Sequence, residues 1–266
     1  MLLIKTCRKL GVFIWFGYRI PIDERVCLIR KTGFETILHW WDDSFYELEG
    51  FTKEEQVSLI RKEGLVIENA HLQFDKVNSL WLDILDGQEA LDSYLADIDG
   101  LADYEIPTAV MHPTSGITPP PTSDIGISRF RVLIEQAEKR GVRIALENVS
   151  NTHILMHVLD TIKSPMLGLC YDSGHDYIWS PAPYELLSKY SDRLYAVHLH
   201  DNMGKNDDHL PLGQGNVNWD AVKCGILNSM YSGSYTLESD PPEISELLTA
   251  QEHLSIHFNS ALAVLQ

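Results

Sequence analysis

The chain has 266 residues, with 38 Asp and Glu against 21 Lys and Arg, so its formal net charge at pH 7 is −17. Proteins that neutralise a phosphate backbone need a basic surface, and this balance therefore argues against a nucleic-acid partner. The longest apolar stretch near the start, residues 10–18, is too short to span a bilayer and predicts no membrane partner. The four cysteines form no CxxC pair, which is typical of reduced thiols and predicts a cytoplasmic protein.

Short apolar segments alternate along the chain with longer amphipathic ones. The apolar segments predict eight strands, at residues 11–16, 34–40, 65–71, 106–112, 142–147, 167–171, 193–198 and 234–238. The amphipathic segments predict helices at residues 23–31, 53–62, 88–104, 127–139, 152–162, 183–190, 219–229 and from about 244 to 264. Regular alternation of this kind indicates a parallel sheet covered by helices.

Eight such units favour a closed α/β barrel over an open doubly wound sheet. The chain has no glycine-rich phosphate loop of the Rossmann or P-loop type, which weakens the open-sheet alternative. A (β/α)8 TIM barrel routinely occupies about 250 residues as one unit. The sequence therefore predicts a single TIM barrel domain over residues 1–266.

Several helix boundaries carry a local signal. Thr52 and Glu55 have the spacing of a capping box, which starts a helix. Gly33, Gly64 and Gly141 each follow a turn rich in Lys or Arg, so each is expected to end a helix with a positive φ.

Side chains that bind metals or move protons recur where the predicted strands end. They are His71, His112, Glu147, Asp172, His175, His198, His200, Asp201, Asp207, Asp208, His209 and Glu238. In a barrel the carboxyl ends of all strands meet at one face, where active sites of this fold lie. Each residue alone has a simpler explanation, such as a structural histidine, a helix cap or a solvated loop charge. Together their carboxylates would repel one another unless a proton or a cation balances them, and this predicts a divalent-metal site.

Five short motifs lie at these positions. They are ALEN at 145–148, DSGH at 172–175, HLHD at 198–201, DDHLPLGQGNVNW at 207–219 and TLES at 236–239. In this order they resemble the xylose isomerase-like TIM barrel superfamily of sugar isomerases and epimerases. That superfamily also contains the endonuclease IV type of abasic-site nuclease, and the resemblance covers nearly the whole chain.

The resemblance implies roles for individual residues. It makes Glu147, Asp172, His198 and Glu238 the ligands of a shared metal, with Mn²⁺ expected first and Mg²⁺, Co²⁺ or Zn²⁺ as alternatives. It places His175 against a substrate oxygen. His71, His112, Asp207 and His209 match positions that carry extra metals in the nuclease branch. We expect substrate contacts from His175, His71, His112, His200, Asp207, His209, Lys205 and Trp40.

The expected activity is a metal-dependent sugar isomerase or epimerase that acts on a ketose or related polyol. Glu147 and Glu238 would remove and return a proton next to a carbonyl, through an enediolate. The acidic chain and its acidic, aromatic early loops favour this activity. The alternatives are an endonuclease IV-like phosphodiesterase, an inosose-type dehydratase and a noncatalytic sugar-binding barrel.

One stretch departs from the better-defined sugar epimerases. Many of them have an Arg shortly after the histidine of the seventh strand, where this chain reads MGKNDD with Lys205 as the only cation. That difference leaves the particular sugar open. The oligomeric state is open too, and a homo-oligomer is one alternative.

Overall fold

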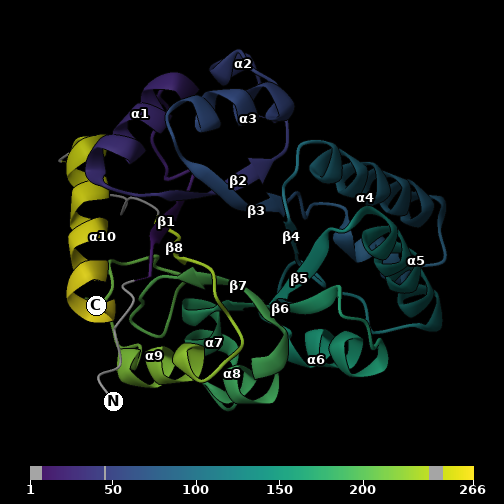
Figure 1. Cartoon of the computed structure of the whole chain (residues 1–266). Helices are drawn as coiled ribbons and strands as arrows, with labels where there is room; N and C mark the ends of the chain where they lie inside the picture. Colours follow the sequence, from purple (N-terminus) through teal and green to yellow (C-terminus); the bar gives the residue numbers. More distant parts are fainter. Residues whose placement is uncertain (1–7, 45, 240–247) are drawn as a thin grey trace.

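Eight parallel strands form the centre of the protein. The computed structural model describes residues 8–44, 46–239 and 248–266. Its strands pair in chain order, and β8 returns to pair with β1, so the sheet closes into a barrel (Figure 1). The strands are β1 Leu10–Phe13, β2 Thr36–Trp41, β3 Val66–Leu72, β4 Thr108–Met111, β5 Arg143–Glu147, β6 Leu167–Asp172, β7 Leu194–Leu199 and β8 Tyr235–Leu237. The predicted (β/α)8 fold is confirmed.

Helices surround the barrel on its outside (Figure 1). They are α1 Ile22–Thr32, α2 Tyr46–Glu49, α3 Lys53–Lys62, α4 Leu85–Asp103, α5 Asp124–Arg140, α6 Thr152–Thr161, α7 Ser173–Trp179, α8 Glu185–Lys189, α9 Trp219–Leu227 and α10 Ala250–Leu265, with 3₁₀ turns at Val77–Trp81 and Ser191–Arg193. In the described part of the chain, no helix is both long enough and apolar enough to cross a bilayer.

The predicted junctions are present. Thr52 and Glu55 form both bonds of a capping box at the start of α3. Gly33, Gly64 and Gly141 have φ values of 115°, 76° and 72°, as expected for residues that end a helix in the left-handed region.

The structure differs from the prediction at the first strand, at two short helices and at the start of the last helix. The first strand ends at Phe13, and Ile14 and Phe16 are buried in the connection that follows, where the Ile14 amide still donates to the Leu38 carbonyl of β2 at 2.9 Å. Two short helices, α2 and α7, were not predicted, because four and seven residues are too few to show a helical period. The eighth helix was predicted from about residue 244. Residues 244–247 lie outside the described residues, and α10 begins at Ala250 after a capping box between Thr249 and Glu252.

Apolar side chains fill the inside of the barrel next to the carboxyl ends of the strands. The main core fills the space between strands and helices. A separate cluster inside the barrel consists of Leu38, Val110, Ala145, Cys170 and Ala196, all fully buried. Three of these residues precede a strand-end residue by two positions: Ala145 comes before Glu147, Cys170 before Asp172, and Ala196 before His198. Since side chains alternate along a strand, these pairs point to the same side, and the small side chains form a floor beneath the polar ones.

His39 provides a test of the packing outside the barrel. Its ring is fully buried, its Nε2 lies 2.9 Å from the Lys53 carbonyl oxygen, and its Nδ1 has no partner. Burial lowers the pKa of His39 to about 4, whereas the unfolded chain has a histidine pKa of about 6.5. The unfolded state therefore takes up a proton that the folded state excludes. Stability present above about pH 6.5 is lost as the pH falls toward 4.

We expect His39→Gln to reduce this acid sensitivity, because Gln can still donate to the carbonyl but does not titrate. Urea unfolding at pH 7.5 and pH 5 should show that the wild type loses roughly 2 kcal/mol more than the variant over this interval. His157→Gln, an exposed change on α6, is the control and should behave as the wild type does. Equal losses in wild type and His39→Gln would contradict the assignment.

Candidate functional site

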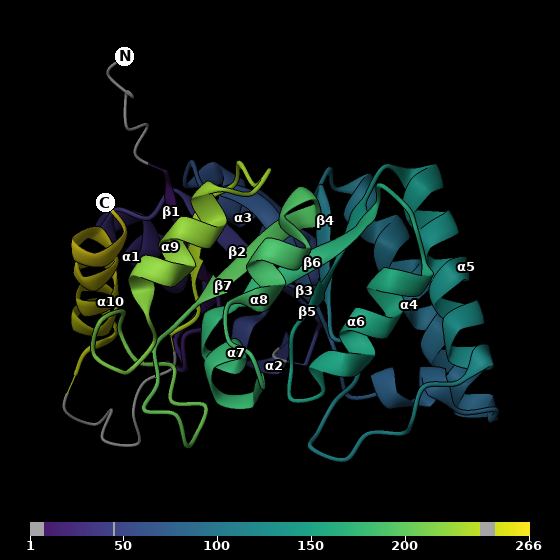
Figure 2. The same cartoon turned by 90° about the horizontal axis from the view of Figure 1, so that it is seen from below.

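The candidate residues gather at the carboxyl end of the barrel. Figure 2 shows α2 and α7 at the lower end of the molecule, which is the end where β2 and β6 finish. Glu147, Asp172 and His198 lie at or next to the last residue of β5, β6 and β7, and Glu238 directly follows β8. All four side chains are at least nine-tenths buried.

Glu147 lies among four imidazoles. Its Oε2 is 3.2 Å from Nε2 of His71, 3.6 Å from Nε2 of His112 and 3.1 Å from Nδ1 of His198, and its Oε1 is 3.1 Å from Nδ1 of His175. These histidines come from β3, β7 and the segments after β4 and β6. The Glu147 carboxylate thus contacts histidines from the β3–β4 part of the barrel and from the β6–β7 part.

The other predicted ligands adjoin this carboxylate. Nδ1 of His198 is 2.9 Å from Oε1 of Glu238 as well as 3.1 Å from Glu147. Asp172, His198 and Glu238 each offer one ligand atom within 4.8 Å of the other two, and Glu147, Asp172 and His175 form a similar group. The structure therefore brings all four predicted ligands together.

The four residues fit a divalent cation by their chemistry and by their orientation. Three carboxylates and one imidazole are an oxygen-rich set suited to Mn²⁺, Mg²⁺, Co²⁺ or Zn²⁺. Oδ2 of Asp172 and both ring nitrogens of His198 are buried and make no hydrogen bond, although carboxylate oxygens lie within 3.1 Å of Nδ1. Buried polar atoms are normally hydrogen-bonded, so atoms that converge without pairing indicate a space for a ligand between them.

Asp172 has two functions in the fold. Its Oδ1 accepts a 2.7 Å hydrogen bond from the His175 backbone amide and so caps α7. Its Oδ2 is the unpartnered oxygen described above. The helix-cap explanation of DSGH is therefore correct, and it coexists with the position of Asp172 in the cluster.

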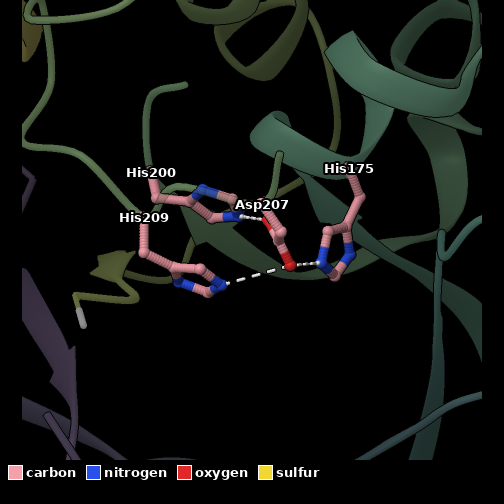
Figure 3. A group of neighbouring side chains, drawn as sticks. All are labelled: His175, His200, Asp207 and His209. Carbon is pink, nitrogen blue, oxygen red and sulfur yellow. Dashed lines mark hydrogen bonds and ion pairs between the residues drawn. The ribbon is translucent and has the colours of Figure 1, made fainter. Parts of the chain in front are cut away.

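A second group consists of His175, His200, Asp207 and His209 (Figure 3). The carboxylate of Asp207 lies between three imidazoles, at 3.0 Å from His175, 3.7 Å from His200 and 3.4 Å from His209. The rings of His200 and His209 stack with centroids 3.9 Å apart. His200 also connects the two groups, because its Nε2 is 3.0 Å from Oδ1 of Asp172.

A third group consists of His71, His112 and Glu147, which offer ligand atoms within 4.8 Å of one another. Phe74 stacks on His112 at 4.5 Å, and Trp40 lies 5.4 Å from His71 between ring centroids. Trp40 is half-buried and its Nε1 has no partner, so it can line a ligand pocket.

The charges of these groups depend on one another. Burial opposes the charged form of Glu147, but His198 and His112 outweigh it and hold the pKa of Glu147 well below its usual value. Burial likewise opposes charge on Glu238, and His198 lowers its pKa to about 2. Burial would lower the pKa of His198, whereas Cys170, Glu238 and Glu147 raise it well above the usual value. Since imidazole binds metal only when deprotonated, a cation here would compete with protons.

Asp201 holds the loop that carries the second group. Its carboxylate accepts hydrogen bonds from the backbone amides of Asn202, Gly213 and Val217 and from Nε1 of Trp219, at 2.8 to 3.0 Å. Its backbone pairs in both directions with Leu210. This fully buried residue ties both ends of the loop between β7 and α9 to the end of β7.

The sequence prediction did not single out Phe74, Cys170 or Trp179, which lie beside residues of the site. Cys170 offers a sulfur within 4.8 Å of Glu147 and His198 ligand atoms, and burial raises the pKa of its thiol to about 12. Its position two residues before Asp172 on one strand is a signal that could have identified it. Trp179 lies 4.9 Å from His175, and their i, i+4 spacing becomes visible only once α7 is known. Lys205 is exposed in the loop between β7 and α9 and stays a predicted substrate contact.

The model of one protein family, described as the xylose isomerase-like TIM barrel, matches residues 26–256. The chain belongs to the xylose isomerase-like TIM barrel family. Solved structures agree with this fold. A D-tagatose 3-epimerase-like protein has a TM-score of 0.75 at 21% identity, with 97% of this chain and 98% of that chain covered. A zinc-bound IolI protein has a TM-score of 0.77 at 18% identity, with coverage of 97% and 98%.

Curated relatives match shorter stretches of the chain. The uncharacterized protein MJ1311 of Methanocaldococcus jannaschii is 30% identical over 180 residues, which is 60% of this chain and 60% of that protein. The fructoselysine 3-epimerase of Escherichia coli O157:H7 is 27% identical over 114 residues, or 40% of this chain and 42% of the enzyme. The chain thus spans about two fifths to three fifths of the length of these two relatives.

Proposed function

We propose that this protein is a metal-dependent isomerase or epimerase of a ketose or related polyol. The observation that carries the proposal is the arrangement of Glu147 and Glu238. Their carboxylates come from different strands and approach the same imidazole nitrogen of His198, at 3.1 Å and 2.9 Å. A pair of carboxylates held this close can share the removal and return of one proton.

In this proposal the chemistry is divided among named side chains. Glu147 and Glu238 move the proton on the carbon next to the carbonyl. Nδ1 of His175 donates to the Asn148 carbonyl, and its Nε2 would donate to a substrate oxygen that takes the place of the Asp207 carboxylate. The aromatic rings of Trp40 and Phe74 exclude water from one wall.

A divalent cation held by Glu147, Asp172, His198 and Glu238 would supply a Lewis acid that favours charge on the substrate oxygen. Three similarities support the proposal. The D-tagatose 3-epimerase-like protein shares the fold, the fructoselysine 3-epimerase aligns with two fifths of the chain, and IolI binds zinc on the same fold.

The test combines metal analysis with proton exchange. The purified protein, loaded with Mn²⁺, is incubated in D₂O with a panel of free hexuloses and pentuloses, and NMR follows deuterium at the carbons next to the carbonyl. We expect bound metal and exchange with at least one sugar, followed by a product epimeric or isomeric to it. Bound metal with no exchange in any ketose would favour a noncatalytic sugar-binding barrel, and loss of water after exchange would favour an inosose-type dehydratase.

A second candidate function is supported by one observation. Besides the cluster of Glu147, Asp172, His198 and Glu238, the described residues contain further groups of possible ligands, including His71–His112–Glu147 and His175–His200–Asp207–His209. Several adjacent cations suit phosphodiester hydrolysis. The charge of −17 opposes duplex binding. Metal-dependent cleavage of an abasic-site duplex would establish this activity in place of the first.

A further inference from the structure

Two cavities lie next to each other at the edge of the site. The inner cavity, of about 200 Å³, is lined by His112, His175 and Asp207 of the groups described above, and by Thr114, Ser150 and Trp179. The outer cavity, of about 180 Å³, lies between α6 and the α7–α8 segment. Ser150 and Trp179 line both cavities.

Trp179 separates the two spaces and contacts the site itself. Its ring lies 4.9 Å from the ring of His175, between centroids, at an angle of 37°. The indole is half-buried at the end of α7. A ligand that reaches His175 therefore has one face of this ring beside it, and an extension of that ligand past the ring enters the outer cavity.

Both cavities contain polar and apolar side chains, but only the inner one includes residues of the groups described above. There His112, His175 and Asp207 adjoin Thr114 Oγ1, which is buried without a hydrogen-bond partner. The outer cavity has an apolar wall, formed by Met156, Trp179, Pro181, Ala182 and Leu186, and its polar lining residues are Ser150, Thr152, His153, Ser180, Glu185 and Lys189. The ammonium of Lys189 is already bonded to Asp160 at 3.0 Å. The functional groups of the inner cavity suit a hydroxyl-rich sugar, and the apolar wall of the outer cavity suits a hydrocarbon chain.

The sizes also indicate a ligand with two parts. Small-molecule sites usually enclose roughly 300 to 1,000 Å³. Each cavity alone falls below this range, whereas the two together fall within it. We propose that the natural substrate is a ketose bearing an apolar arm of about four to six atoms, with its sugar in the inner cavity and its arm in the outer one. The reaction of the sugar rests on the proposed function, whereas binding of the arm depends only on the outer cavity formed by Trp179, Met156 and Leu186.

The experiment compares D-fructose with two derivatives, 1-butylamino-1-deoxy-D-fructose and 6-O-butyl-D-fructose. Deuterium exchange and calorimetric binding are measured with the Mn²⁺-loaded protein. We expect one derivative to exceed D-fructose by on the order of tenfold to 100-fold in kcat/KM and in affinity, because burial of each methylene contributes a few-fold.

Two Met→Trp variants locate the effect. Met156→Trp fills the outer cavity and should reduce the preference for the butylated sugar to less than threefold while leaving values for D-fructose within about twofold. Met230→Trp, an exposed change at the opposite end of the barrel, should leave the preference intact.

Exchange of D-fructose with no preference for either derivative would overturn the arm site alone, as would an undiminished preference in Met156→Trp. A binding preference without exchange of any sugar would remove the proposed reaction and retain the arm site. Absence of both would overturn both.

Discussion

Replacing Glu147 or Glu238 by Gln should lower proton exchange by a factor of about 10²–10⁴, the usual cost of losing a general base. Glu and Gln have nearly the same shape, and the Gln carbonyl oxygen can still coordinate weakly. Its amide, however, accepts no proton at neutral pH. We therefore expect metal affinity to fall as well, because a formal charge is lost, but excess Mn²⁺ should restore occupancy without restoring exchange.

The measurement is deuterium incorporation at the substrate α-carbon under saturating Mn²⁺, together with metal content after gel filtration. Glu89→Gln, an exposed change on α4, is the matched control and should leave both values unchanged. Rescue of exchange by metal to near the wild-type rate in both variants would show that the two carboxylates only hold the cation. The base would then be sought at His175 or His200.

The second large effect concerns stability. Asp201→Ala should lower the free energy of unfolding by about 3–5 kcal/mol, because three backbone amides and the Trp219 indole lose one buried, charged acceptor. In a chain of this size the melting temperature should fall by on the order of 10 °C. Asp201→Asn keeps one acceptor oxygen and should lose less.

Hydrogen exchange gives a local readout of the same change. The amides of Gly213 and Val217 donate directly to Asp201, so they should exchange faster in Asp201→Ala even well below the melting temperature. Asp83→Ala removes an exposed carboxylate between the first 3₁₀ turn and α4 and should alter neither quantity. Unchanged exchange at Gly213 and Val217 would show that the loop is held by other contacts.

The barrel could be predicted from the sequence because each buried strand appears as a short apolar run between amphipathic segments. Each strand buries both faces, so its apolar run is visible, and a polar residue at the end of the run marks the barrel mouth. Glu147 and His198 could be placed in this way. Gly33 and Gly141 were equally clear, since a positive φ selects glycine locally.

Other features of the site depend on contacts between distant segments, and no local sequence pattern predicts them. The hydrogen bonds of Asp201 span up to 18 residues, and nothing in HLHD reveals which amides they reach. Trp179 became part of the site only through α7, whose seven residues follow β6 without an intervening loop. His200 lies near the carboxylates of both Asp172 and Asp207, and this position depends on how the loop after β7 folds back toward the barrel.

The junction at Asp172 has a consequence for divergence within the family. This residue is at once the last of β6 and the N-cap of α7, so no linker residue separates strand from helix. An insertion or deletion there would displace the capping oxygen and its unpartnered neighbour together, and selection should therefore keep the length of this junction fixed. By contrast, the loop between β7 and α9 is anchored at its two ends by Asp201, and residues 203–206 between the anchors are exposed. New substrate preferences should arise by changes of length and sequence in that loop, while the β6–α7 junction stays constant in length.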